Sequence, residues 1–129
     1  MGNEGRCIES PKSDIKKEMT IFGKIINGEL PSEKVFENER ILAIKDRYPA
    51  APVHILIMPK KAITSLQALQ PEDFPLISEI ILVAQQLAKE FEIEDGYRFL
   101  TNSGEEAGQT IFHLHFHLIG GRRLLHLLG

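Results

Sequence analysis

The feature that most restricts how this chain can fold is an alternating segment near its C-terminus, IFHLHFHLI, over residues 111–119. Apolar residues and histidines alternate in it, and a period of two is the pattern of a β-strand. Residues two apart on a strand point to the same side. The segment is therefore predicted to be a strand with two unlike faces. The core face carries Phe112, Leu114, Phe116 and Leu118, and the other face carries His113, His115 and His117.

Four other segments are predicted to be strands, at residues 34–38, 40–46, 53–59 and 96–102. The first two are joined by a tight turn at Asn38-Glu39 and should form a hairpin. The third, VHILIMP, is almost entirely apolar, as expected of an interior strand that is buried on both faces.

Two segments have the spacing of amphipathic helices. IFGKIING follows Thr20, which can cap it, and is predicted to be a short helix that ends at Gly28 and has its isoleucines and phenylalanine on one face. A long helix is predicted over residues 71–91, where Pro75 fits only in the first turn. A sheet of about five mostly antiparallel strands with one short and one long helix makes an α+β domain.

Length and composition exclude several classes of protein. The chain has 129 residues, a formal charge of −3 and one cysteine, Cys7. This length suits one domain. We assign that domain to residues 19–129, because residues 1–18 are polar, lack periodicity and are predicted to be a flexible N-terminal extension. The charge argues against a nucleic-acid surface, and no apolar run approaches the roughly 20 residues that span a bilayer. A lone cysteine is typical of a reducing compartment, so we expect a cytoplasmic protein.

The three alternating histidines allow three interpretations. They could be a polar exposed strand face, although such faces usually use Thr, Lys, Glu and Ser. They could bind zinc with His54 as a further ligand. Same-face neighbours lie about 6.5–7 Å apart along a strand, however, so three in a row do not converge easily on one ion. The third interpretation is a nucleophilic imidazole that attacks phosphorus and holds the phosphoryl group covalently.

The residues just upstream fit the third interpretation. The loop SGEEAGQT contains Gly104 and Gly108, which let backbone N–H groups approach an anion. Thr110 adds a hydroxyl beside the predicted strand, and Asn102 ends the strand before the loop. Donors of this kind can stabilise charge that develops on phosphoryl oxygens.

The stretch GQTIFHLHFHLIGGR resembles the signature of the histidine triad (HIT) family, in which three histidines alternate with apolar residues. TIFGKIINGELPSEKVFENERILAIKDRYPAAPVHILIMPKKAI and GYRFLTNSGEEAGQT resemble the N-terminal half and the central strand and loop of one branch, the histidine triad nucleotide-binding (HINT) proteins. The resemblance runs from about Thr20 to Arg122 and implies a HIT-like fold.

This resemblance implies a hydrolase of purine nucleoside phosphoramidates that cleaves the P–N bond, releases AMP or GMP, and needs no metal or other cofactor. His115 corresponds to the nucleophile, which carries the nucleotide as a covalent intermediate. His117 corresponds to the residue that binds the α-phosphate. His113 and His54 would orient the cluster and manage protons, although His54 taken alone in its apolar strand reads as a core histidine.

The resemblance also implies a binding site for the nucleotide and a homodimer. Asp46 corresponds to the carboxylate that binds the ribose hydroxyls, whereas an Asp before a turn is more often only a cap. The phosphate and leaving-group contacts correspond to Asn102, the Gly108-Gln109 backbone and Thr110. The apolar slot for the base corresponds to Phe22, Ile25, Ile44 and Leu56, with Ile44 standing where an aromatic residue often stacks. The chain ends in GRRLLHLLG, where close relatives have Trp and paired Pro.

Two other functions remain open at this point. One is a dinucleoside polyphosphate hydrolase, from a sister branch with the same triad. The other is a purine-nucleotide-binding interaction protein in which slow hydrolysis is incidental. Turnover of a phosphoramidate distinguishes an enzyme from a binding module.

Overall fold

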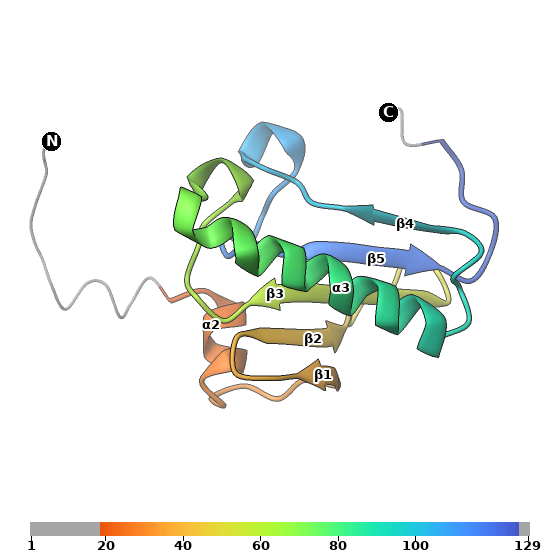
Figure 1. Ribbon diagram of the computed structural model, residues 1–129, viewed down its shortest axis with the longest axis horizontal. Helices are drawn as coiled ribbons and strands as arrows, with labels where there is room; N and C mark the ends of the chain where they lie inside the picture. Colours follow the sequence, from red (N-terminus) through yellow and green to blue (C-terminus); the bar gives the residue numbers. More distant parts are fainter. Residues whose placement is uncertain (1–18, 127–129) are drawn as a thin grey trace, which may run out of the picture.

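The computed structural model describes residues 19–126 and contains one five-stranded antiparallel sheet with the order β1-β2-β3-β5-β4 (Figure 1). The predicted extension, 1–18, and the last three residues of the predicted domain, 127–129, lie outside the described residues. The strands are β1 (Lys34–Glu37), β2 (Ile41–Lys45), β3 (Val53–Pro59), β4 (Tyr97–Leu100) and β5 (Phe116–Gly120). The helices are α2 (Ile21–Ile26) and α3 (Phe74–Glu90), with 3₁₀ turns η1 (Leu66–Ala68), η2 (Pro71–Asp73) and η3 (Glu105–Ala107). The α+β prediction is confirmed.

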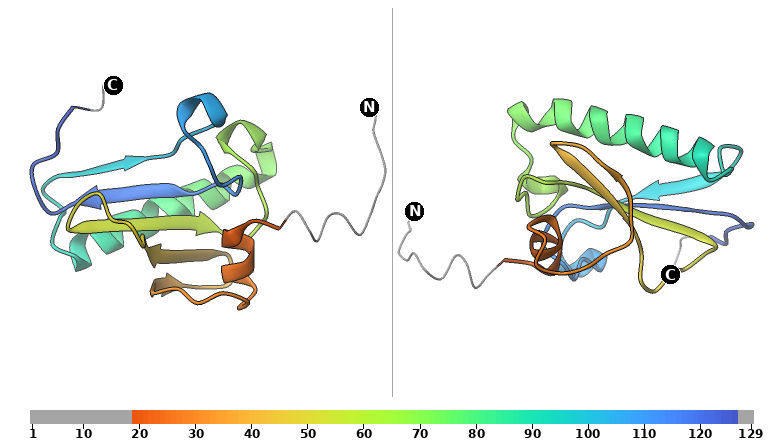
Figure 2. Two further views of the ribbon diagram at one scale, coloured as in Figure 1. Left: turned by 180° about the vertical axis from the view of Figure 1, so that it is seen from behind. Right: turned by 90° about the horizontal axis from the view of Figure 1, so that it is seen from below.

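The central strand β3 is buried along nearly its whole length, as its apolar sequence predicted. On one face of the sheet it packs under α3, which lies across the strands (Figures 1 and 2). The other face carries a smaller apolar cluster under α2. The inner face of α3 buries Ile80, Val83, Ala84, Leu87 and Ala88. Among the described residues, no helix is long and apolar enough to cross a membrane.

The long helix starts three residues later than predicted. Residues 71–73 form the turn η2, in which the Gln70 N–H donates to the Asp73 carboxylate at 2.9 Å, and α3 begins at Phe74 with Pro75 in its first turn. By helical spacing Ile81 lies on the same side of the helix as Ile77 and Ala84, yet it is 46% exposed. The apolar face is therefore narrower than the spacing of isoleucines and leucines indicated.

The short helix α2 is capped by Thr20, whose hydroxyl accepts from the Gly23 N–H at 3.0 Å. Gly28, just beyond the helix, has φ +83°, a conformation that favours glycine. Both predictions are confirmed. Only Phe22 and Ile25 are buried, however, and Ile21 is 48% exposed. The helix packs on the sheet through Phe22 and Ile25, with the partly buried Ile26 beside them.

The histidine segment is a strand only from Phe116 onward, so the predicted strand over 111–119 is wrong in its first half. Pairing with β3 ends at Ile57, because Pro59 has no N–H to extend the ladder. The Leu114 N–H donates instead to the Ile63 carbonyl at 2.6 Å. Phe112, predicted to enter the core, is 45% exposed.

Candidate active site

A pocket of about 920 Å³ opens on the sheet face that carries α2, opposite α3. It receives nearly all of the site residues predicted from the sequence. Those that line it are Phe22, Ile25, Ile44, Asp46, Leu56, Asn102, Gly108, Gln109, Thr110, His115 and His117. His54 and His113 are buried and do not line it.

His115 presents a free imidazole nitrogen to this pocket. Its Nδ1–H donates to the His113 carbonyl at 2.7 Å, and since a carbonyl can only accept, the proton must be on Nδ1. Nε2 therefore keeps its lone pair, and it makes no hydrogen bond within residues 19–126. The Phe22 ring stands edge-on against the imidazole, with centroids 4.9 Å apart. Burial lowers the pKa of His115, which keeps the ring neutral.

The backbone around His115 is held from two sides. The Thr101 hydroxyl donates to the His115 carbonyl at 2.6 Å. His113 is buried, and its Nε2–H donates to the Pro59 carbonyl at 2.7 Å. His113 thus fixes the carbonyl that orients His115, and burial also lowers its own pKa. These contacts support the orienting role expected of His113.

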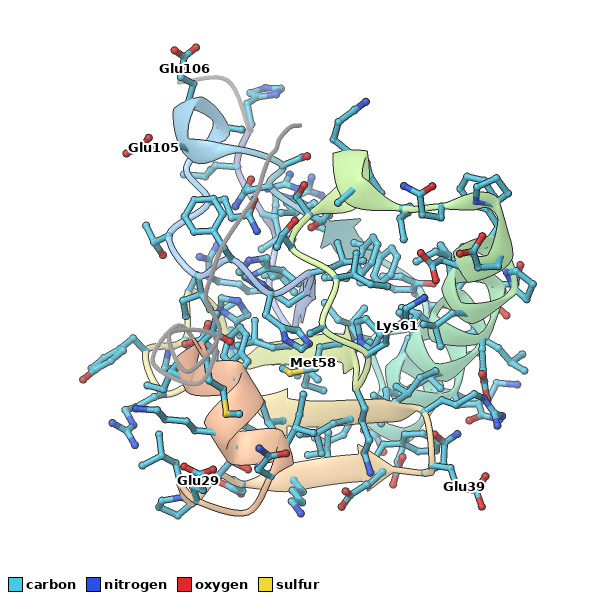
Figure 3. All side chains as sticks on the ribbon, turned by 90° about the vertical axis from the view of Figure 1, so that its left-hand side faces the viewer. Glu29, Glu39, Met58, Lys61, Glu105 and Glu106 are labelled. Atoms are coloured by element: carbon cyan, nitrogen blue, oxygen red, sulfur yellow. The ribbon has the colours of Figure 1, made fainter. Side chains whose placement is uncertain are left out.

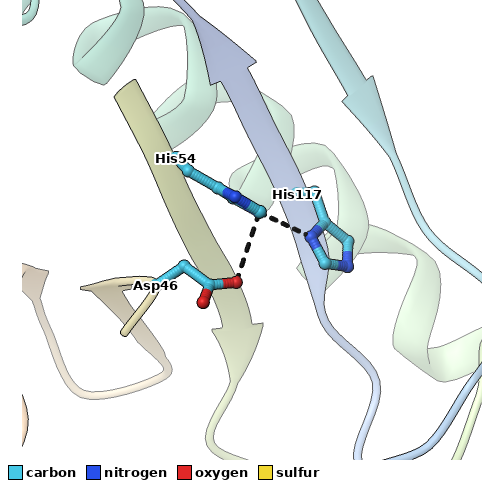
Figure 4. A group of neighbouring side chains, drawn as sticks. All are labelled: Asp46, His54 and His117. Atoms are coloured by element: carbon cyan, nitrogen blue, oxygen red, sulfur yellow. Dashed lines mark hydrogen bonds and ion pairs between the residues drawn. The ribbon is translucent and has the colours of Figure 1, made fainter. Parts of the chain in front are cut away.

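His117 receives its orientation from His54 on the neighbouring strand β3. The Ala50 N–H donates to His54 Nδ1 at 2.9 Å, so the His54 proton is on Nε2. That Nε2–H lies 2.9 Å from His117 Nδ1 (Figure 4). His117 Nδ1 accepts, and its proton is therefore on Nε2. Burial, with the adjacent His115 and His54, lowers the pKa of His117 to about 4.

Asp46 makes hydrogen bonds that hold the backbone and also lines the pocket. Its backbone N–H donates to the His54 carbonyl, which extends the pairing of β2 and β3. Its Oδ1 accepts from the Tyr48 N–H at 2.8 Å, so it caps the following turn. Its Oδ2 lies 3.3 Å from His54 Nε2, and the residue also lines the pocket. The cap is therefore compatible with a ribose-binding role.

Asp46, His54 and His117 are the only grouping of metal-ligand type within residues 19–126, with ligand atoms within 4.8 Å of one another. A metal would need an unprotonated His54 Nε2. The Ala50 N–H keeps the His54 proton on Nε2, so this nitrogen is a donor. His113 and His115 each commit a ring nitrogen to a carbonyl and do not converge with the other two. The donor set does not fit the zinc interpretation.

The loop before the triad is built differently from the sequence expectation. The Gly108 and Gln109 N–H groups, expected to face phosphate, donate to the Glu105 and Gly104 carbonyls at 3.0 and 3.1 Å. Gly108 has φ +94°, which favours glycine. Glu105 and Glu106 point away from the rest of the molecule, so their charges face solvent rather than the pocket (Figure 3).

The Gln109 side chain is a structural clamp that the sequence reasoning missed. It is 3% exposed, and its Oε1 accepts from the Gly104 N–H at 2.8 Å. Its Nε2 donates to the Thr64 carbonyl at 2.7 Å and to the Ile111 carbonyl at 3.0 Å. One amide thus ties the loop to the segment after β3. No periodic signal in the sequence marks such a residue.

Comparison with known proteins places these features in one family. A family model described as HIT domain matches residues 27–124. A HIT-like protein of Chlamydia pneumoniae is 54% identical over 106 residues, which make up 82% of this chain and 96% of the relative.

Solved structures agree with this match. A HIT family hydrolase from Legionella pneumophila has a TM-score of 0.82 and 39% identity, covering 84% of this chain and 98% of that one. A HIT family hydrolase from Clostridium thermocellum has a TM-score of 0.81 and 44% identity, covering 84% and 96%. A histidine triad nucleotide-binding protein from Candida albicans has a TM-score of 0.70 and 32% identity, covering 85% and 86%.

Proposed function

The chain belongs to the HIT family, and from this membership and the geometry of its pocket we propose that it is a metal-independent hydrolase of purine nucleoside phosphoramidates, of the HINT branch. The observation that carries the proposal is the hydrogen bond from His115 Nδ1–H to the His113 carbonyl. It leaves an unprotonated nitrogen facing a pocket, which is the state that a nucleophilic imidazole needs.

The reaction proceeds in two displacements at one phosphorus. His115 Nε2 attacks the α-phosphorus and forms a P–N bond, while the substrate P–N bond breaks with its electron pair going to nitrogen. That nitrogen takes a proton from water and leaves as an amine. The hydroxide left from that water then attacks the same phosphorus, the electron pair of the P–Nε2 bond returns to His115, and the nucleoside monophosphate is released.

The surrounding groups are suited to the charge that develops on phosphorus. His117 Nε2–H and the Thr110 hydroxyl are donors of the pocket, and Asn102 adds an amide. The low pKa of His117 follows from its burial beside two other imidazoles. The Nε2–H of neutral His117 would donate to an anionic phosphate opposite it, and His54 fixes the direction of that donor.

The rest of the pocket is suited to a nucleoside. Its volume of about 920 Å³ lies within the range of roughly 300–1,000 Å³ that small-molecule sites occupy. The apolar side chains of Phe22, Ile25, Ile44 and Leu56 form a wall for a base. Asp46 supplies an acceptor for a vicinal diol.

We also propose that the protein is a homodimer. The outer face of α3 exposes Phe74, Ile81 and Leu82, and β4 is an edge strand of the sheet. Exposed apolar side chains next to an unpaired strand edge are a surface that pairing with a second copy would cover.

The test compares the turnover of adenosine 5′-phosphoramidate with that of diadenosine polyphosphate on the wild type and on three variants. His115→Asn is expected to lose at least about a thousandfold in turnover, the scale of a lost covalent nucleophile. His113→Ala should lose much less, because its carbonyl remains. His126→Asn, an exposed histidine outside the pocket, is the matched control.

Trapping of the intermediate completes the test. Substrate labelled at the α-phosphate should leave acid-labile label on the wild type and none on His115→Asn. Label that persists on His115→Asn would contradict the assignment of the nucleophile. Faster turnover of diadenosine polyphosphate would favour the sister activity, and binding of AMP without any turnover would favour a binding module.

A further inference from the structure

The segment GGR, at residues 120–122, closes the histidine motif and does not line the pocket. It comes at the end of β5, while the loop 46–52 leads into β3. The two strands are antiparallel with Val53 opposite Gly120, so the loop and this segment lie side by side at one end of the sheet (Figure 1). The end of the motif is therefore next to Ala50 of that loop.

Few contacts hold the loop itself. Residues 47–50 are exposed, and within residues 19–126 no backbone-to-backbone hydrogen bond involves residues 47–51. Ala50 is nevertheless tied at both of its backbone polar groups. Its N–H donates to His54 Nδ1 at 2.9 Å, and its carbonyl accepts from the Arg122 guanidinium at 2.8 Å. Arg122 therefore holds the residue that orients His54.

The backbone after β5 places Arg122 where it can do this. Gly121 has φ +98°, and a Cβ added there would lie only 3.0 Å from the Pro52 Cβ, so the chain passes the loop with no room for a side chain. A second nitrogen of the Arg122 guanidinium donates to the Arg123 carbonyl at 2.9 Å. The guanidinium is thus held by two carbonyls, which suits its planar set of donors.

The hydrogen bonds continue from Ala50 to the pocket. Because the Ala50 N–H occupies His54 Nδ1, the His54 proton is on Nε2. That Nε2–H lies 2.9 Å from His117 Nδ1 and keeps the His117 proton on Nε2, where the ring lines the pocket (Figure 4). One unbroken chain of contacts therefore connects Arg122 to the donor that faces the phosphate.

We propose that Arg122 is a positioning residue of the reaction, which acts on His117 through Ala50 and His54. The role in the reaction rests on the proposed function, whereas the orientation of the two imidazoles does not. Arg122 lies outside the pocket, so it should affect the rate of the chemical step and not the affinity for nucleotide. Its hydrogen bond to Ala50 is exposed to water, which can replace it in part, so we expect an effect of about fivefold.

The kinetic test is a single-turnover measurement at saturating adenosine 5′-phosphoramidate. Arg122→Met keeps the aliphatic stem and removes every donor, and it is expected to form the nucleotidyl-His115 intermediate about fivefold more slowly while binding AMP as the wild type does. Arg123→Met is the matched control, because within residues 19–126 Arg123 contributes only its backbone carbonyl, and its rate should be unchanged. An unchanged rate in Arg122→Met, or a loss of AMP affinity alone, would overturn the inference.

A double variant tests whether the effect passes through His54. In a His54→Gln background the imidazole that Ala50 orients is gone, so adding Arg122→Met should slow the reaction little further. The same fivefold loss in both backgrounds would show that Arg122 acts by another route, and the relay would be refuted.

A spectroscopic measurement separates this inference from the proposed function. In protein labelled with ¹⁵N-histidine, Arg122→Met is expected to move His54 and His117 from the form protonated on Nε2 toward a mixture of tautomers. His113 should not change, because its ring donates to the Pro59 carbonyl. Unchanged His54 and His117 signals, or equal changes in His113 from a general loosening, would overturn the inference. If the two signals shift as expected but the wild type turns over no phosphoramidate, the proposed function fails and the orienting contact of Arg122 stands.

Discussion

Acidification from pH 7 to pH 5 is expected to cost the fold about 2 kcal/mol at His117 alone. Burial, together with the nearby imidazoles of His115 and His54, lowers the pKa of His117 from 6.5 to about 4. The unfolded chain binds a proton as the pH falls through 6.5, while the folded protein stays neutral there until about pH 4. Stability is therefore fully present above pH 6.5 and is lost between 6.5 and 4. The slope in that window is about 1.4 kcal/mol per pH unit.

Urea unfolding at pH 7, 6 and 5, followed by circular dichroism, measures this loss, with His117→Gln as the comparison. The wild type should lose about 2 kcal/mol more than the variant over this range. The pKa values of His54, His113 and His115 are lowered too, so the wild type should lose more in total than His117 accounts for. The pKa values of Glu37, Asp73 and Glu79 are lowered by their Lys or Arg partners, so these carboxylates titrate below this range. Parallel pH profiles for wild type and variant would refute the burial argument.

Three further predictions concern the effect of chelation, the deletion of residues 1–18 and the proposed dimer. Prolonged chelation should leave both melting temperature and hydrolysis unchanged, because the His54 proton occupies the nitrogen that a metal would need; activity lost and restored by zinc alone would contradict this. Deletion of residues 1–18 should leave activity and Tm nearly unchanged, because their sequence has no packing pattern; a fall of several degrees would show that they dock. Leu82→Glu should convert a dimer of about 29 kDa to a monomer of about 15 kDa in sedimentation, whereas a wild type that is already monomeric would refute the proposed assembly.

The fold was predictable where the signal was local. A period of two or 3.6, the apolar run VHILIMP, the turn at Asn38-Glu39 and a capping Thr20 are all local patterns. Such patterns predicted the five strands and the two helices found within residues 19–126. The alternating pattern could not predict that β5 begins only at Phe116. It depends on Pro59, 54 residues from His113, which ends the ladder and offers its carbonyl to that imidazole.

The sequence predicted which residues form the site but not the hydrogen bonds between them. Most of the residues that the resemblance named line the pocket, with His54 and His113 as the exceptions. The tautomers could not be read from the sequence, because the partners of the rings are backbone atoms or side chains brought together by strand register. Ala50 and Thr101, which orient His54 and His115, have no chemical signature of their own.

The short helix α2 gives the pocket a wall that can open separately from the sheet. Six residues do not form a stable helix in isolation, and α2 is held by the burial of Phe22 and Ile25 and by the packing of Ile26 beside them. Its transient undocking should therefore require far less free energy than global unfolding, so its amide hydrogens should exchange with solvent long before those of β3. A base bound between Phe22 and Leu56 would contact both the helix α2 and the sheet. Ligand protection from hydrogen exchange should then be largest in residues 21–26, which makes α2 a reporter of occupancy that requires no turnover.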